Sequence, residues 1–94
     1  MKESIIQAKI IRYLEKDLGC YIVKVIKATK SGVCDLLICY DGRFIGIEVK
    51  TPSTRENTSP LQRVNIDLIH KSGGIAFVAC SVEDVKEQFA LLQV

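Results

Sequence analysis

Three charged side chains stand at a spacing that suits metal-dependent chemistry. Asp35 precedes one apolar run, Glu48 and Lys50 end a second one, and the dipeptide Asp41-Gly42 separates the two runs. Asp-Gly favours the two-residue turn of a β-hairpin because both central positions tolerate positive φ. Pairing outward from that turn places Asp35 directly opposite Glu48 on one face of the sheet, roughly 5 Å apart at Cβ, where like charges destabilise.

A bound divalent cation would compensate for this pair of carboxylates, because hard oxygen ligands held at short range are what Mg²⁺ selects. Lys50 follows Glu48 by two residues, so the period of a strand places it on the same face. We take Asp35, Glu48 and Lys50 as a candidate metal-dependent active site. The alternative is a strand-end polar residue and an edge carboxylate paired with Lys50. The apolar neighbours of Glu48 count against it, because an unpaired carboxylate among them would be costly.

The composition is that of an ordinary globular protein. Of 94 residues, 48% are hydrophobic and 26% charged, with no long apolar run and no signal-peptide pattern at the N-terminus. We expect one domain over residues 1–94, no membrane partner, and a cytoplasmic location in a bacterium or in the host cell of a phage or virus. The net charge of +2 is too small to indicate nucleic acid by itself.

Four cysteines lie in or beside apolar runs without any C-x-x-C pair: Cys20, Cys34, Cys39 and Cys80. We expect them to be reduced and mostly buried. A zinc cluster is disfavoured, because paired ligand spacings are missing and the only histidine, His70, is distant in sequence.

The elements around the hairpin follow from periodicity. An amphipathic helix is predicted over about 4–18 and a β-branched first strand over 20–28. After Lys50, a polar connection of about eight residues is long enough to suggest a function. Ser59 and Pro60 begin a second helix, which ends near residue 72. Its predicted apolar face consists of Leu61, Val64, Leu68 and Ile69.

A short apolar strand at 75–80 and a closing helix at about 82–92 complete the chain. Strand, helix, strand implies a right-handed crossover, so the last strand should run parallel to the one that carries Glu48. The order αβββαβα predicts an α/β fold with a central four-stranded mixed sheet flanked by helices.

With these elements placed, the chain resembles the VRR-NUC family of the PD-(D/E)XK nuclease superfamily, which has a restriction-endonuclease-like core. The resemblance covers nearly the whole chain and rests on Glu3, Gly32-Val33-Cys34-Asp35, Glu48-Val49-Lys50 and Ser59-Pro60-Leu61-Gln62. It implies Mg²⁺- or Mn²⁺-dependent hydrolysis of DNA phosphodiester bonds, by a homodimer selective for branched DNA such as four-way junctions. The family usually has proline where Cys34 stands, and we expect the Cys34 side chain to point away from Asp35.

Asp35 and Glu48 would bind the metal through carboxylate oxygens, and the carbonyl of Val49 could complete a site that leaves positions for water and phosphate. Lys50 would orient the water or stabilise charge on the phosphate. The resemblance adds Glu3 as a further metal or water ligand and Gln62 as an active-site residue. Each has an alternative: Glu3 complements the dipole of the first helix, and Gln62 forms a capping box with Ser59.

Lys27, Lys30 and Arg55 are candidate phosphate contacts, because the lysines flank the turn before Asp35 and Arg55 lies in the long connection. The alternative is a solvated loop surface. We find no obvious base-reading helix or aromatic stacking platform, so recognition should depend on backbone and shape. The rival function is a non-catalytic nucleic-acid-binding or assembly module with the same fold.

Overall fold

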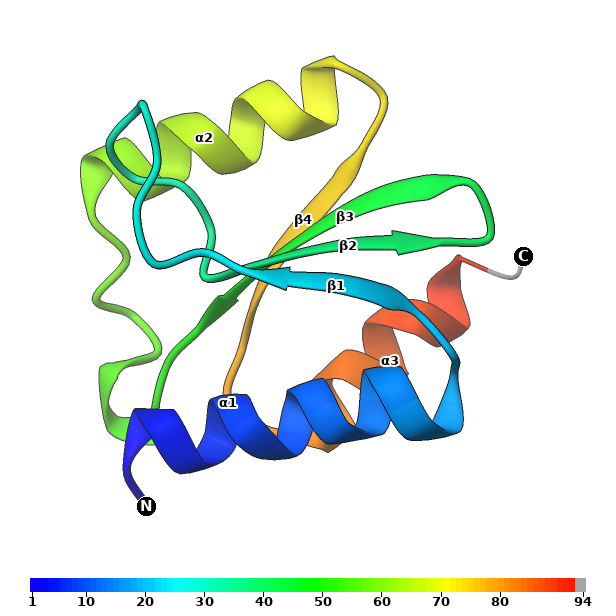
Figure 1. Cartoon of the computed structure of the whole chain (residues 1–94). Coiled ribbons are helices and arrows are strands. Elements are labelled where there is room, and N and C mark those ends of the chain that lie inside the picture. The colour runs from blue at the N-terminus through cyan, green and yellow to red at the C-terminus, as the bar shows by residue number, and fades with distance from the viewer. Residues whose placement is uncertain (93–94) are drawn as a thin grey trace.

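The computed structural model describes residues 1–92 and contains the predicted elements in the predicted order (Figure 1). The helices are α1 (Glu3–Arg12), which continues as a π-helical turn (Tyr13–Asp17), α2 (Pro60–Lys71) and α3 (Val82–Leu91). The strands are β1 (Tyr21–Lys24), β2 (Leu36–Tyr40), β3 (Arg43–Val49) and β4 (Ile75–Ala79), and a 3₁₀ turn (Pro52–Thr54) precedes α2. Among the described residues, no helix has the length and apolar character needed to cross a membrane.

The four strands form one mixed sheet in the order β1-β2-β3-β4. β1, β2 and β3 pair antiparallel, and β4 runs parallel to β3, as the crossover through α2 predicts. The hairpin has the predicted register, with Tyr40 opposite Arg43, and its turn residues Asp41 and Gly42 have φ values of 51° and 75°. The predicted α/β fold with a central mixed sheet is confirmed.

The helices cover the two faces of the sheet unequally (Figure 1). α1 and α3 pack on one face, where Ile10 and Phe89 join a core that includes Ile38, Ile45 and Ile47 from the central strands. α2 lies on the other face over β3 and β4, where Ile69 contacts the backbone at Gly46 and Gly74 so closely that an added methyl group would collide with it. The outer half of that second face, formed by β1 and β2, is left without a helix among the described residues.

The first strand is shorter than predicted. β1 ends at Lys24, because β2 begins only at Leu36 and the backbone beyond Val25 has no ladder partner. Residues 25–33 instead form a loop, closed where the N–H of Val25 donates to the carbonyl of Asp35 at 2.8 Å. The β-branched composition of 20–28 indicated a strand but could not indicate where its partner begins.

Three of the four residues predicted to form the apolar face of α2 are exposed. Leu61, Val64 and Leu68 are 44–55% exposed, and the buried residue of this helix is Asn65. α2 lies to one side of the sheet, so Asn65 and Ile69 face inward while the stripe formed by the other three faces outward.

Candidate active site

Asp35 stands immediately before β2 and is fixed at two points. Its Oδ2 accepts a hydrogen bond from the backbone N–H of Val49 at 2.9 Å, and its carbonyl accepts one from Val25. The β2–β3 register pairs Leu36 with Ile47, and one further step along it would place Asp35 opposite Glu48, in agreement with the effect of the Asp35 carboxyl on the pKa of Glu48. The hairpin therefore holds the two carboxyl groups side by side at the end of the sheet.

Glu48 is buried on the α2 face, because it alternates with Ile47 and Val49, which point into the core under α1 and α3. Its side chain is only 2% exposed, and its Oε2 atom has no hydrogen-bond partner. Burial raises the pKa of Glu48 to about 8, with a further contribution from the neighbouring carboxyl of Asp35. A buried carboxylate with an unpaired oxygen is unfavourable, so this position favours a proton or a cation.

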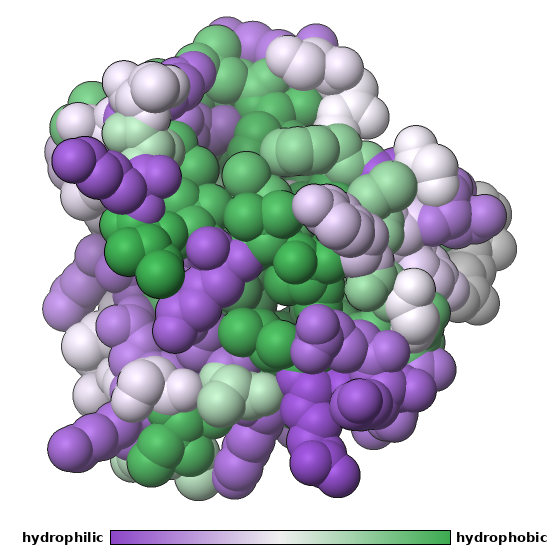
Figure 2. Space-filling view, in the orientation of Figure 1, coloured by the Kyte–Doolittle hydropathy of each residue, from purple (hydrophilic) through white to green (hydrophobic). Residues whose placement is uncertain are grey.

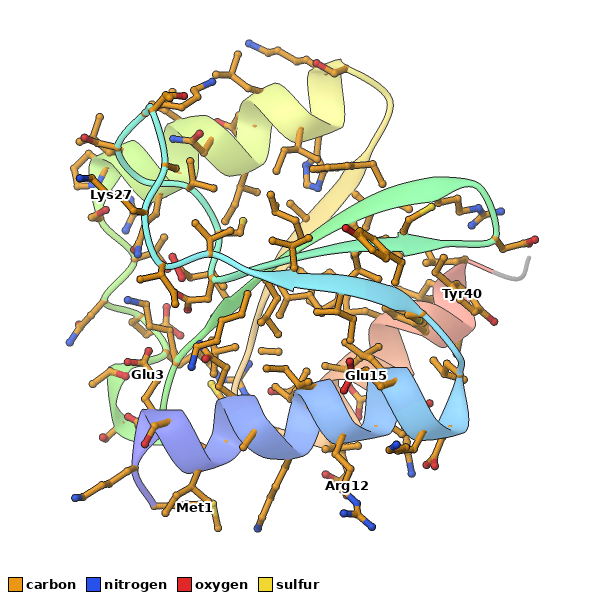
Figure 3. All side chains as sticks on the ribbon, in the orientation of Figure 1. Met1, Glu3, Arg12, Glu15, Lys27 and Tyr40 are labelled. Atoms are coloured by element: carbon orange, nitrogen blue, oxygen red, sulfur yellow. The ribbon has the colours of Figure 1, made fainter. Side chains whose placement is uncertain are left out.

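Lys50 and Glu3 both act on this carboxyl group. The positive charge of Lys50 lowers the pKa of Glu48 and the negative charge of Glu3 raises it, after the larger effects of burial and Asp35. Lys50 is half-buried, and its N–H donates to the carbonyl of Ala79, which extends the β3–β4 pairing by one residue. Glu3 is exposed in the first turn of α1, at the same edge of the molecule as Lys27 (Figure 3).

The residues present suit a hard cation, but they would supply only some of its ligands. Within residues 1–92, no three His, Cys, Asp or Glu side chains gather into a group that could hold a metal ion. Asp35, Glu48 and the carbonyl of Val49 would supply only part of a coordination sphere. Such a partial set suits Mg²⁺, which keeps several waters and is commonly bound by one or two carboxylates plus substrate phosphates. Glu3 stays a predicted ligand.

Gln62 is engaged in the first turn of α2. Its Oε1 accepts from the N–H of Ser59 at 2.9 Å, while Ser59 Oγ accepts from the N–H of Gln62 at 3.2 Å. This is the capping box that the S-x-x-Q pattern indicated. An active-site role would require the side chain to leave this cap, and that role stays a prediction.

The expectation for Cys34 is wrong. Its thiol lies against Gly46, where an added Cβ would be 3.0 Å from the sulfur, and so it faces the same side as Glu48. Alternation does not extend to Cys34 because β2 begins two residues later. Burial, followed by the negative charges of Glu48 and Asp35, raises the pKa of the thiol to about 12. Cys34 is therefore a buried, uncharged side chain that lines the site.

The predicted phosphate contacts differ in their surroundings. Lys27 and Lys30 are exposed on the loop that leads to Asp35. Arg55 is exposed as well, but its Nη2 forms an ion pair with Asp84 Oδ2 at 2.8 Å. Arg55 would have to exchange this partner for a phosphate, whereas the two lysines are exposed and form no ion pair within the described part of the chain.

Sequence reasoning missed two residues that position the loop before Asp35. Asn65 Nδ2 donates to the carbonyl of Ser31 and to the carbonyl of Leu61, both at 2.9 Å. Gly32 has φ +80°, and an added Cβ would lie 2.5 Å from the carbonyl carbon of Leu61. The loop and the first turns of α2 are thus in direct backbone contact. The sequence feature that could have identified Asn65 is that a polar residue stands among the regularly spaced apolar residues of α2.

Comparison with solved structures finds a chain described as "VRR_NUC domain". It is 27% identical in sequence, with a TM-score of 0.72, and the match covers 94% of this chain and 94% of that chain. No family model matches the sequence, and no curated protein matches it. The likeness therefore extends over α1, the hairpin with Asp35 and Glu48, and the helices that follow.

Proposed function

The chain belongs to the VRR-NUC family of nucleases, and from this premise we propose that it is a Mg²⁺- or Mn²⁺-dependent endonuclease that hydrolyses DNA phosphodiester bonds. The observation that carries the proposal is the buried Glu48 Oε2 without a partner, opposite Asp35. A purely structural carboxylate would be expected to have its hydrogen bonds satisfied.

The residues around Glu48 support distinct roles. When bound, the metal would lower the pKa of a water molecule and neutralise charge on the scissile phosphate. Asp35 is held by the Val49 N–H through one oxygen, and so it keeps the other for a ligand. Lys50 supplies a point charge near the same carboxylates, where it can stabilise negative charge that develops on the phosphate.

We propose further that the substrate is branched DNA, cleaved by a homodimer. Lys27 and Lys30, exposed on the loop that leads to Asp35, would bind phosphates, which position a duplex without reading its sequence. A cytoplasmic location fits the four cysteines, which form no disulfide.

The test is a cleavage panel of linear duplex, flap, fork and four-way junction, with Mg²⁺, Mn²⁺ or Ca²⁺. We expect nicking with the first two ions and binding without cleavage in Ca²⁺. Asp35→Asn should abolish nicking, while Asp17→Asn, which changes an exposed carboxylate of the π-helical turn, should not. Folded protein that binds these DNAs but never cleaves them would support the non-catalytic module instead.

A further inference from the structure

A single carboxylate joins the end of β4 to the connection that follows Lys50. Asp84, in the first turn of α3, accepts two hydrogen bonds at the same oxygen, Oδ2. One comes from the backbone N–H of Cys80 and the other from Arg55 Nη2, both at 2.8 Å. The side chain of Asp84 is 23% exposed and that of Arg55 is 47% exposed. This ion pair therefore lies at the surface, where a ligand can reach it.

The ion pair lies at the active-site end of the sheet. The N–H of Lys50 donates to the carbonyl of Ala79, and the next residue along the chain is Cys80, whose N–H the carboxylate accepts. The Cys80 thiol also donates to the carbonyl of Thr51 at 3.5 Å. The end of β4, the residue after Lys50 and the ion pair thus form one connected group of contacts.

Arg55 can leave Asp84 without a change in the backbone around either residue. The turn before Arg55 is held by its own hydrogen bonds, because the N–H of Thr51 donates to Thr54 Oγ1 and the N–H of Thr54 donates to the carbonyl of Thr51, both at 3.0 Å. Asp84 keeps its hydrogen bond from Cys80 when the arginine departs. The exchange therefore moves one flexible side chain and leaves the end of β4 in place.

A backbone phosphate of DNA has the chemistry to displace Asp84 from this guanidinium. Within the described residues, Arg55 contacts the carboxylate through Nη2 alone, whereas a guanidinium can bind a phosphate through two parallel N–H bonds. An exposed ion pair shifts an equilibrium by only about 1.4- to fivefold, so a bidentate phosphate can replace it. Figure 2 shows mostly hydrophilic and neutral residues, in purple and white, along the left edge where the connection after β3 runs in Figure 1. Such a surface suits a charged backbone.

We propose that Asp84 competes with the substrate for Arg55 and withholds this arginine until a backbone phosphate displaces the carboxylate. The proposal rests on the proposed function, because the phosphate belongs to the DNA that is cleaved. Its consequence is selectivity. A nucleic acid that reaches the metal site but places no phosphate beside the first turn of α3 leaves Arg55 on Asp84 and lacks that contact. Asp84 is thus a specificity-determining residue that does not itself touch the reacting atoms.

The test is a double-mutant cycle on DNA affinity, measured with the full chain in Ca²⁺ by fluorescence anisotropy of labelled linear duplex and four-way junction. Asp84→Asn keeps an oxygen for the Cys80 N–H but removes the charge that holds Arg55, so affinity should rise about two- to fivefold. Arg55→Gln should weaken binding and reduce the slope of log affinity against log salt by about one. In the Arg55→Gln background, Asp84→Asn should give no gain.

Glu83→Gln is the matched control, because it removes the same charge from an exposed neighbour in the first turn of α3. It should change affinity less than Asp84→Asn does, and its effect should be the same with and without Arg55. An equal gain from Glu83→Gln, or a gain from Asp84→Asn that survives Arg55→Gln, would overturn the proposal.

Turnover in Mg²⁺ separates this proposal from the proposed function. Asp84→Asn should lower KM and leave kcat unchanged, because the residue acts on binding and not on the reacting atoms. Nicking by wild type without any gain in affinity from Asp84→Asn refutes the role of Asp84 alone. DNA binding with the expected cycle but without nicking refutes the nuclease alone, and a wild type that binds no DNA refutes both.

Discussion

Replacing Glu48 with glutamine should make the metal-free protein more stable at alkaline pH while removing its activity. The pKa of Glu48 is about 8 in the folded protein, against 4.5 for an unperturbed glutamate. Between these two pH values the folded state binds more protons than the unfolded state. The stability that protonated Glu48 contributes is therefore fully present below pH 4.5 and is lost as the pH rises to about 8. Each pKa unit corresponds to about 1.4 kcal/mol, so the full loss is on the order of 4–5 kcal/mol.

This loss in the free energy of unfolding is an upper value for the metal-free wild type. It is large compared with the total free energy of unfolding of a typical protein, which is about 5–15 kcal/mol. Glu48→Gln cannot ionise, and its amide can donate to the neighbouring carboxylate of Asp35. The substitution should therefore remove most of the decline in stability between pH 5 and pH 9. Urea unfolding in the presence of a chelator, at several pH values, measures it. Glu15→Gln, at an exposed position in the π-helical turn, should keep the wild-type profile.

Added Mg²⁺ gives the second half of this prediction. An ion that binds only the folded state adds about 2.7 kcal/mol at a concentration one hundred times its Kd. Wild type at pH 8 should gain stability with Mg²⁺, and Glu48→Gln should gain little. The reasoning fails if the two proteins lose equal stability between pH 5 and pH 9, or if both respond equally to Mg²⁺.

Three further substitutions test the supports of the site. Gly32→Ala should lower the free energy of unfolding by about 2–4 kcal/mol, because the φ of Gly32 is positive and the new Cβ would meet the Leu61 backbone. The control Gly19→Ala, where φ is positive but the surrounding space is open, should lower it by about 1–2 kcal/mol in the same thermal unfolding experiment. Asn65→Ala should cost about 1–3 kcal/mol by leaving backbone carbonyls unpaired and should lower kcat/KM; unchanged cleavage would contradict its positioning role. Lys50→Ala should reduce kcat by at least tenfold with unfolding still cooperative, and normal turnover would rule out its charge as necessary.

Features set by neighbouring residues could be predicted from the sequence. The positive φ values of Asp41 and Gly42 suit a two-residue turn, and this turn sets the hairpin register, which when extended one step beyond Leu36 places Asp35 opposite Glu48. The burial of Glu48 followed from its apolar neighbours. Cys34 was placed wrongly because alternation was extended to a residue outside the strand. The contact of Gly32 with Leu61 joins residues 29 positions apart, and no local pattern reports it.

The stripe on α2 shows what periodicity can and cannot establish. Spacing identified Leu61, Val64 and Leu68 as an apolar side of the helix, and that identification is correct. Periodicity does not show whether the surface that would bury this side of the helix belongs to the same chain or to a partner, since burial against a partner produces the same pattern. Within one chain the inward positions of α2 are taken by Asn65, which holds the loop before Asp35, and by Ile69. The helix thus presents one side to the loop before Asp35 and another to solvent.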